Sequence, residues 1–69
     1  MIKVESENYV GKTAVEMLAA ETQREIYGAM FSHAYLLFIN GQVVDKKDYA
    51  SRVIEKGDLI SLFPIYTGG

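Results

Sequence analysis

Residues 35–44 read YLLFINGQVV, and they carry the clearest structural signal in the chain. The first five of these residues are apolar and rich in strand-forming types, which predicts an interior β-strand over Tyr35–Ile39. Asn40-Gly41 follows, and this pair favours a two-residue hairpin turn because both positions tolerate a positive φ. The stretch therefore predicts a β-hairpin whose returning strand occupies residues 42–44.

Two further strands are predicted before this hairpin. Residues 2–5 alternate apolar and polar side chains, a pattern that is typical of a half-buried strand. Turn-forming residues follow at positions 6–8, and Tyr9-Val10 is predicted to return as a second, short strand.

A helix is predicted between these strands and the hairpin. Thr13 and Glu16 have the spacing of a capping box, in which each side chain satisfies a free backbone amide. The helix is expected over residues 14–27 and should stop at Gly28. Its apolar stripe is predicted from residues at helical spacing: Val15, Leu18, Ala19, Thr22 and Ile26.

The remainder of the chain predicts one more strand. Residues 45–52 indicate a turn and one helical turn, with Tyr49 as an anchor. Lys56-Gly57-Asp58 is a second tight turn, and residues 59–63 form the last strand. Pro64 should end that strand because it lacks a backbone donor.

This order of elements predicts an α+β fold with two layers, a mixed sheet packed on one main helix. Strand parity assigns one face of the sheet to the core, with Ile2, Val4, Leu37, Ile39, Ile60 and Leu62. The same parity leaves Leu36, Phe38, Ser61 and Phe63 on the opposite face. We interpret Leu36, Phe38 and Phe63 as a partner-binding surface, because large exposed apolar patches are often functional, although scattered exposed apolar residues are also ordinary.

The last six residues are predicted to form a flexible tail after a single domain at residues 1–63. They are Pro64, Ile65, Tyr66, Thr67, Gly68 and Gly69. Six extended residues reach roughly 20 Å, which would carry the Gly69 carboxylate away from the domain. Glycines without a Cβ can enter a channel that is too narrow for side chains. Tyr66 is expected to contact a partner, since tyrosine is enriched at interfaces.

Composition excludes several classes of function. The chain has no cysteine, and His33 is its only histidine, so neither a cysteine nucleophile nor a metal site is expected. A net charge of −2 with scattered lysines argues against nucleic acid binding. No apolar run is long enough to cross a bilayer, and we expect a cytoplasmic protein. The carboxylate pairs Asp45/Asp48 and Glu21/Glu25 are interpreted as solvated charges rather than as a hydrolase site.

The chain resembles the ubiquitin-like sulfur carriers of molybdopterin and thiamine biosynthesis over essentially its whole length. The most specific segment is FPIYTGG at residues 63–69, which is similar to the ending of the molybdopterin synthase small subunit: Phe-Pro, two residues, a small residue and Gly-Gly. Supporting segments are Gly11-Lys12-Thr13, Asn40-Gly41 and Gly57-Asp58. The resemblance implies a β-grasp fold with about five strands. The tail slightly favours the molybdopterin branch, while residues 45–52 resemble the thiamine branch more.

The resemblance also implies a mechanism and a set of partners. A separate, E1-like adenylating enzyme would use ATP to activate the Gly69 carboxylate, and a sulfur donor would convert it to a thiocarboxylate. The sulfur would then pass to a pterin or thiazole precursor in a synthase large subunit or a thiazole synthase. The chain would bind no cofactor and would be a cosubstrate or small subunit rather than an enzyme.

Two alternatives from other classes stay open at this point. A ubiquitin-like modifier would share the fold and the tail, with Gly69 joined to a lysine of a target protein. A β-grasp binding module would share the fold, and its terminal glycines would have no role.

Overall fold

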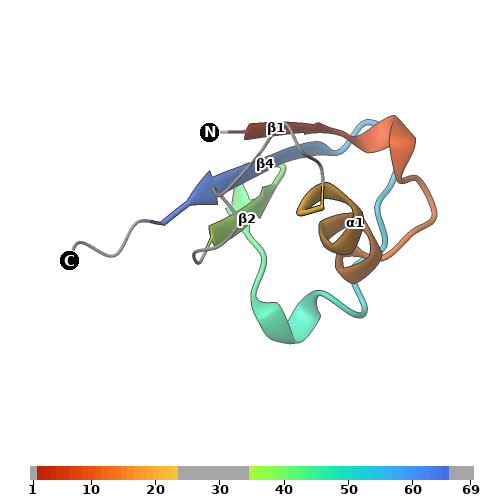
Figure 1. Ribbon diagram of the computed structural model, residues 1–69. Helices are drawn as coiled ribbons and strands as arrows, with labels where there is room; N and C mark the ends of the chain where they lie inside the picture. Colours follow the sequence, from red (N-terminus) through yellow and green to blue (C-terminus); the bar gives the residue numbers. More distant parts are fainter. Residues whose placement is uncertain (1, 24–34, 66–69) are drawn as a thin grey trace.

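The computed structural model describes residues 2–23 and 35–65, in which one helix lies against one face of one sheet (Figure 1). In sheet order the strands are β1 (Ile2–Glu5), β4 (Leu59–Pro64), β2 (Tyr35–Ile39) and β3 (Gln42–Val43). The helix is α1 (Ala14–Glu21), and two short 3₁₀ turns, η1 (Ser6–Asn8) and η3 (Lys46–Asp48), lie in the connections. The predicted α+β class is confirmed.

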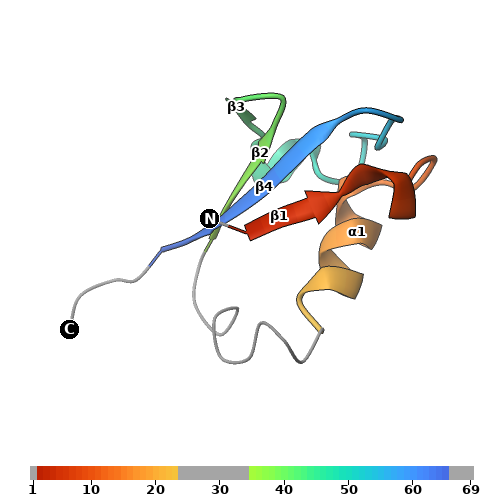
Figure 2. The ribbon, with the colours of Figure 1, turned by 90° about the horizontal axis from the view of Figure 1, so that it is seen from above.

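The sheet within the described residues has four strands rather than about five, and its pairings are antiparallel rather than mixed. Figure 2 shows β4 between β1 and β2. The hairpin between β2 and β3 forms as predicted, with positive φ angles of 55° at Asn40 and 82° at Gly41. The tight turn before β4 is confirmed as well, with Gly57 at a φ of 87°.

The predicted strand at Tyr9-Val10 does not form. The Tyr9 N–H donates to Ser6 O at 2.8 Å, which closes η1 and turns the chain away from β1. Downstream residues then pair with another segment: the Gly11 N–H donates to Ile54 O at 2.9 Å, and the Ile54 N–H donates to Lys12 O at 2.8 Å. The residues directly after the predicted strand are thus held by Ile54, away from β1.

Helix α1 begins with the predicted capping box. The Glu16 N–H donates to Thr13 Oγ1 at 3.2 Å, and the Thr13 N–H donates to Glu16 Oε1 at 3.0 Å. The Thr13 N–H and the Thr13 hydroxyl both donate to the Glu16 carboxylate, and these two hydrogen bonds hold the pKa of Glu16 below its usual value. The helix ends at Glu21, earlier than predicted, with Thr22 as its C-cap. The rest of the expected helix, with Ile26 and Gly28, lies outside the described residues, as does His33.

The buried face of α1 differs from the predicted stripe. Val15 is 46% exposed and Ala19 is also exposed, so both predictions of burial are wrong. The Ala14 and Val15 amides donate to Arg52 O and Tyr49 O, which fixes the rotation of the first turn against residues 49–52. The residues that this rotation buries are Ala14, Met17, Leu18 and Glu21.

The hydrophobic core lies between α1 and the sheet face predicted for it. Strand parity predicted the core-facing strand residues correctly, although one of them, Ile2, is only half-buried. Tyr49 packs against the core, as predicted for an anchor. Ile54 joins the core from the connection before β4. The buried core residues are Val4, Ala14, Met17, Leu18, Leu37, Ile39, Ile54, Ile60 and Leu62.

Candidate functional site

The face of the sheet opposite α1 carries an aromatic patch, which we define as Leu36, Phe38, Val43 and Phe63. Leu36 pairs with Phe63 across β2 and β4, and Phe38 pairs with Val43 across β2 and β3. The Phe38 and Phe63 rings meet edge to face, with centroids 4.9 Å apart. Leu36 is 39% exposed and Phe63 is 37% exposed. The open-face placement predicted for Leu36, Phe38 and Phe63 is confirmed, and their role in binding a partner stays a prediction.

Leu59 is a further apolar residue on this face, and the sequence analysis did not assign it there. It is 74% exposed and has the parity of Ser61 and Phe63 along β4. Strand parity alone could have placed it there. Leu59 lines a groove of about 380 Å³ over β1 and the start of β4, which residues 3–6 and 57–61 form.

The predicted tail begins next to the aromatic patch. Pro64 is the last residue of β4 and pairs with Tyr35, directly after Phe63. Ile65 follows and is exposed. The division into a domain at residues 1–63 and a tail at residues 64–69 stays a prediction. Tyr66, Thr67, Gly68 and Gly69 lie outside the described residues.

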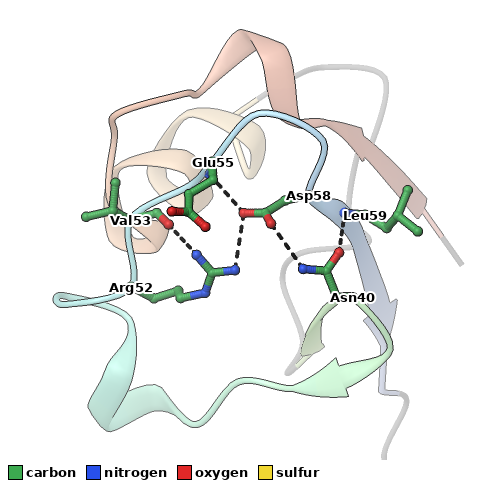
Figure 3. Close-up of polar contacts among 6 residues, drawn as sticks. All are labelled: Asn40, Arg52, Val53, Glu55, Asp58 and Leu59. Atoms are coloured by element: carbon green, nitrogen blue, oxygen red, sulfur yellow. Dashed lines mark hydrogen bonds and ion pairs between the residues drawn. The ribbon is translucent and has the colours of Figure 1, made fainter.

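Two turns that look unrelated in sequence are joined by a buried carboxylate, as Figure 3 shows. Asp58 has a side chain that is only 7% exposed. Its Oδ1 accepts from Asn40 Nδ2 at 3.1 Å, and its Oδ2 accepts from the Glu55 N–H at 2.8 Å. Arg52 forms an ion pair with Asp58 Oδ2 at 3.2 Å and also donates to the Val53 carbonyl. We call Asn40, Arg52 and Asp58 the Asp58 cluster.

The Asp58 cluster stabilises the charged carboxylate. Burial alone would raise the pKa of Asp58. The hydrogen bonds from Glu55 and Asn40, together with the charge of Arg52, outweigh burial and hold the pKa below its usual value. Asn40 Oδ1 in turn accepts from the Leu59 N–H at 2.9 Å. The cluster therefore fixes the β2–β3 hairpin to the start of β4, which positions the strands that carry the aromatic patch.

A second buried carboxylate corrects the interpretation of Glu21. The residue is 1% exposed and accepts a hydrogen bond from the Tyr9 hydroxyl at 2.6 Å, so it is not a solvated charge. Its predicted companion Glu25 lies outside the described residues. The hydrogen bond joins the end of α1 to the turn after β1. Asp45 and Asp48 are exposed, as predicted.

Over residues 2–23 and 35–65, no helix is both long and apolar enough to cross a membrane. The same part of the chain holds no group of three or more His, Asp or Glu side chains placed to bind a metal ion.

Comparison with known protein families gives a match that includes both the sheet and the last residues of the sequence. A family model described as the ThiS family matches residues 3–69. The match covers β1 from Lys3 onward, the other three strands, the aromatic patch, the Asp58 cluster and the two final glycines. A comparison with curated proteins found no matching relative.

Proposed function

The chain belongs to the ThiS family of ubiquitin-like sulfur carriers, and we propose that its working group is the carboxylate of Gly69. The fold is accordingly a β-grasp, and the chain has a sulfur-carrier role in biosynthesis. Carriers of this family are small non-catalytic proteins that work with adenylating enzymes and synthases. The observation that carries the proposal is a family match that runs through Gly69.

The first proposed step activates Gly69. A carboxylate is unreactive toward a sulfur nucleophile, because its negative charge repels the nucleophile and oxide is a poor leaving group. In the active site of an adenylating enzyme, a Gly69 oxygen attacks the α-phosphorus of ATP and pyrophosphate leaves. The product is an acyl-adenylate, in which AMP is a good leaving group.

The second proposed step replaces AMP with sulfur. A sulfide-level donor attacks the Gly69 carbonyl carbon, AMP departs with the bonding electrons, and the donor's proton passes to solvent. The result is a thiocarboxylate at the end of the chain. Gly68 and Gly69 suit this step because a backbone without side chains can approach a nucleotide closely.

The aromatic patch is proposed as the surface that docks the partner and aims the tail. Phe63 lies immediately before Pro64, where β4 ends, so a partner bound over the patch lies beside the start of the tail. Aromatic side chains at the centre of an interface commonly supply much of the binding energy. The Asp58 cluster supports this role by fixing the strands on which the patch lies.

We propose a cofactor precursor as the acceptor of the sulfur. Both a pterin precursor and a thiazole precursor are compatible with a carrier of this family. The FPIYTGG ending at residues 63–69 favours the pterin precursor. The chain itself supplies no catalytic group in this proposal and acts as the cosubstrate of the synthase.

Pyrophosphate release tests the activation step directly. The chain is mixed with ATP and a cognate adenylating enzyme, and pyrophosphate is measured against a variant that lacks Gly69. Release that needs the chain and stops with the truncated variant supports the proposal, and equal release from both contradicts it. Thiocarboxylated carrier is then offered to a molybdopterin synthase large subunit and to a thiazole synthase. Product from the first enzyme supports the pterin assignment, and product from the second alone overturns it.

A further inference from the structure

Strand β1 forms an edge of the sheet within the described residues. Its pairing partner there is β4, since the segment that could have formed a neighbouring strand turns away through η1. An edge strand presents backbone donors and acceptors that can pair with another chain. Lys3 and Glu5 are exposed on this strand.

The hydrogen bonds of Leu59 show which backbone groups of β1 face outward. The Leu59 carbonyl accepts from the Asn40 N–H at 2.8 Å, and the Leu59 N–H donates to Asn40 Oδ1, so both groups face β2. Backbone direction alternates along an antiparallel strand, and Ile60 therefore faces β1. Its partner Val4 faces β4 in return. The neighbouring residues Lys3 and Glu5 direct their backbone groups away from the sheet.

The charges on strand β1 are complementary to those on an antiparallel copy of the same strand. Lys3 and Glu5 lie on the open face, opposite Ser61 and Leu59, and have no salt-bridge partner in the part of the chain that the structure describes. They are separated by Val4. An antiparallel copy of β1 centred on Val4 would place each lysine opposite the other copy's glutamate.

We propose that β1 pairs with β1 of a second copy of this chain, in antiparallel register about Val4. Lys3 of each copy exchanges both backbone hydrogen bonds with Glu5 of the other, which gives four hydrogen bonds and two cross-strand ion pairs. Val4 meets Val4 of the second copy at the two-fold axis. The two sheets become one continuous sheet, and the unpaired edges at β1 disappear.

The geometry of this dimer leaves the aromatic patch of each copy uncovered. Because Lys3 and Glu5 lie on the open face in both copies, the two aromatic patches lie on the same side of the joined sheet. Antiparallel β1 strands make the two β4 strands run in opposite directions, so the two Pro64 residues, where β4 ends, lie at opposite ends of the joined sheet. The contact is short, and interfaces below about 1,200 Å² are typically weak and transient. We therefore expect a reversible dimer that forms at high protein concentration.

Charge reversal tests the register. Lys3→Glu brings two acidic side chains opposite each other across the interface, and Glu5→Lys brings two basic side chains together. Each variant alone should therefore dimerise about tenfold or more weakly. Mixing the two variants restores attraction between the strands by pairing the acidic edge of one with the basic edge of the other, and a heterodimer of at least wild-type affinity should form. The double variant Lys3→Glu/Glu5→Lys should dimerise as the wild type does. Lys47→Glu is the matched control, since Lys47 is exposed on η3.

The measurements are sedimentation velocity across a concentration series and native mass spectrometry with one variant labelled by ¹⁵N. Amide exchange supplies a readout without mutation, because the Lys3 and Glu5 amides should become protected as concentration rises while that of Val4 changes little. A wild-type chain that stays monomeric at millimolar concentration would overturn the proposal. Dimers that Lys3→Glu and Glu5→Lys form as well as the wild type would also overturn it, because another surface would then be responsible.

Discussion

Asn40 and Asp58 join the turn that follows β2 to the turn that precedes β4, through a 3.1 Å hydrogen bond between Asn40 Nδ2 and Asp58 Oδ1. The same asparagine accepts from the Leu59 N–H, so one side chain satisfies both a carboxylate and a strand amide. Arg52 forms an ion pair with Asp58, and its carbonyl accepts a hydrogen bond from the Ala14 N–H at the start of α1. A single buried charge thereby ties the hairpin, the connection before β4 and the last strand together.

The Asp58 cluster predicts a specific dependence of stability on acid. The pKa of Asp58 in the folded chain lies below its ordinary value of 3.8, so the unfolded state takes up the proton first as the pH falls. The stabilisation is complete above 3.8 and is lost as the pH falls from there through the lowered pKa. Urea unfolding at a series of pH values should show Asp58→Asn less stable than the wild type at neutral pH, with a difference that shrinks in acid.

Asp48→Asn is the control for this experiment, because Asp48 is exposed on η3 and its substitution removes the same charge. A difference between the wild type and Asp58→Asn that stays constant from neutral pH to well below 3.8 would show that Asp58 is not the titrating group.

The core assignment predicts that Leu37→Ala strongly destabilises the domain. Leu37 is fully buried at the centre of β2, and a Leu→Ala change in a core costs about 2–5 kcal/mol. That cost is a large part of the total stability of a small domain. Val15→Ala should change the free energy of unfolding much less, since Val15 is 46% exposed. Equal stability of the two variants in urea unfolding would contradict the assignment.

The aromatic patch predicts variants that lose partner binding but stay folded. Phe63→Ser should weaken binding to a cognate adenylating enzyme by about 2 kcal/mol if Phe63 is an interface anchor, and Phe38→Ser should act in the same direction. Val15→Ser is the control, because it removes an exposed apolar side chain from the opposite layer. Calorimetric binding combined with thermal unfolding separates the two effects. Wild-type binding by both patch variants would remove the patch from the interface.

The β2–β3 hairpin and the two faces of the sheet could be predicted from sequence because the information for them is local. Asn40-Gly41 specifies a hairpin turn by its tolerance of positive φ, and strand parity assigns whole faces at once. Leu37 and Phe38 were therefore placed on opposite faces correctly. The same parity along β4 could also have predicted that Leu59 lies on the open face.

The errors have a different origin, since long-range contacts decide them. Apolar residues lie on two sides of α1, and the backbone bonds from Ala14 and Val15 to residues 49–52 select the side that is buried. Tyr9-Val10 has strand-forming residues, yet η1 and the pairing of Gly11 with Ile54 remove it from the sheet. The Asp58 cluster joins residues up to 18 positions apart, and no local pattern signals such a contact.

Intact-mass analysis can detect sulfur on the Gly69 carboxylate directly. The chain is incubated with a cognate adenylating enzyme, ATP and a sulfide-level donor, beside a variant that lacks Gly69 and a reaction without ATP. We expect a mass gain equal to one oxygen replaced by sulfur, located on the C-terminal peptide, and only in the complete reaction of the full chain. An unchanged mass in that reaction, or the same gain in the variant without Gly69, would contradict the assignment of the Gly69 carboxylate as the sulfur-carrying group.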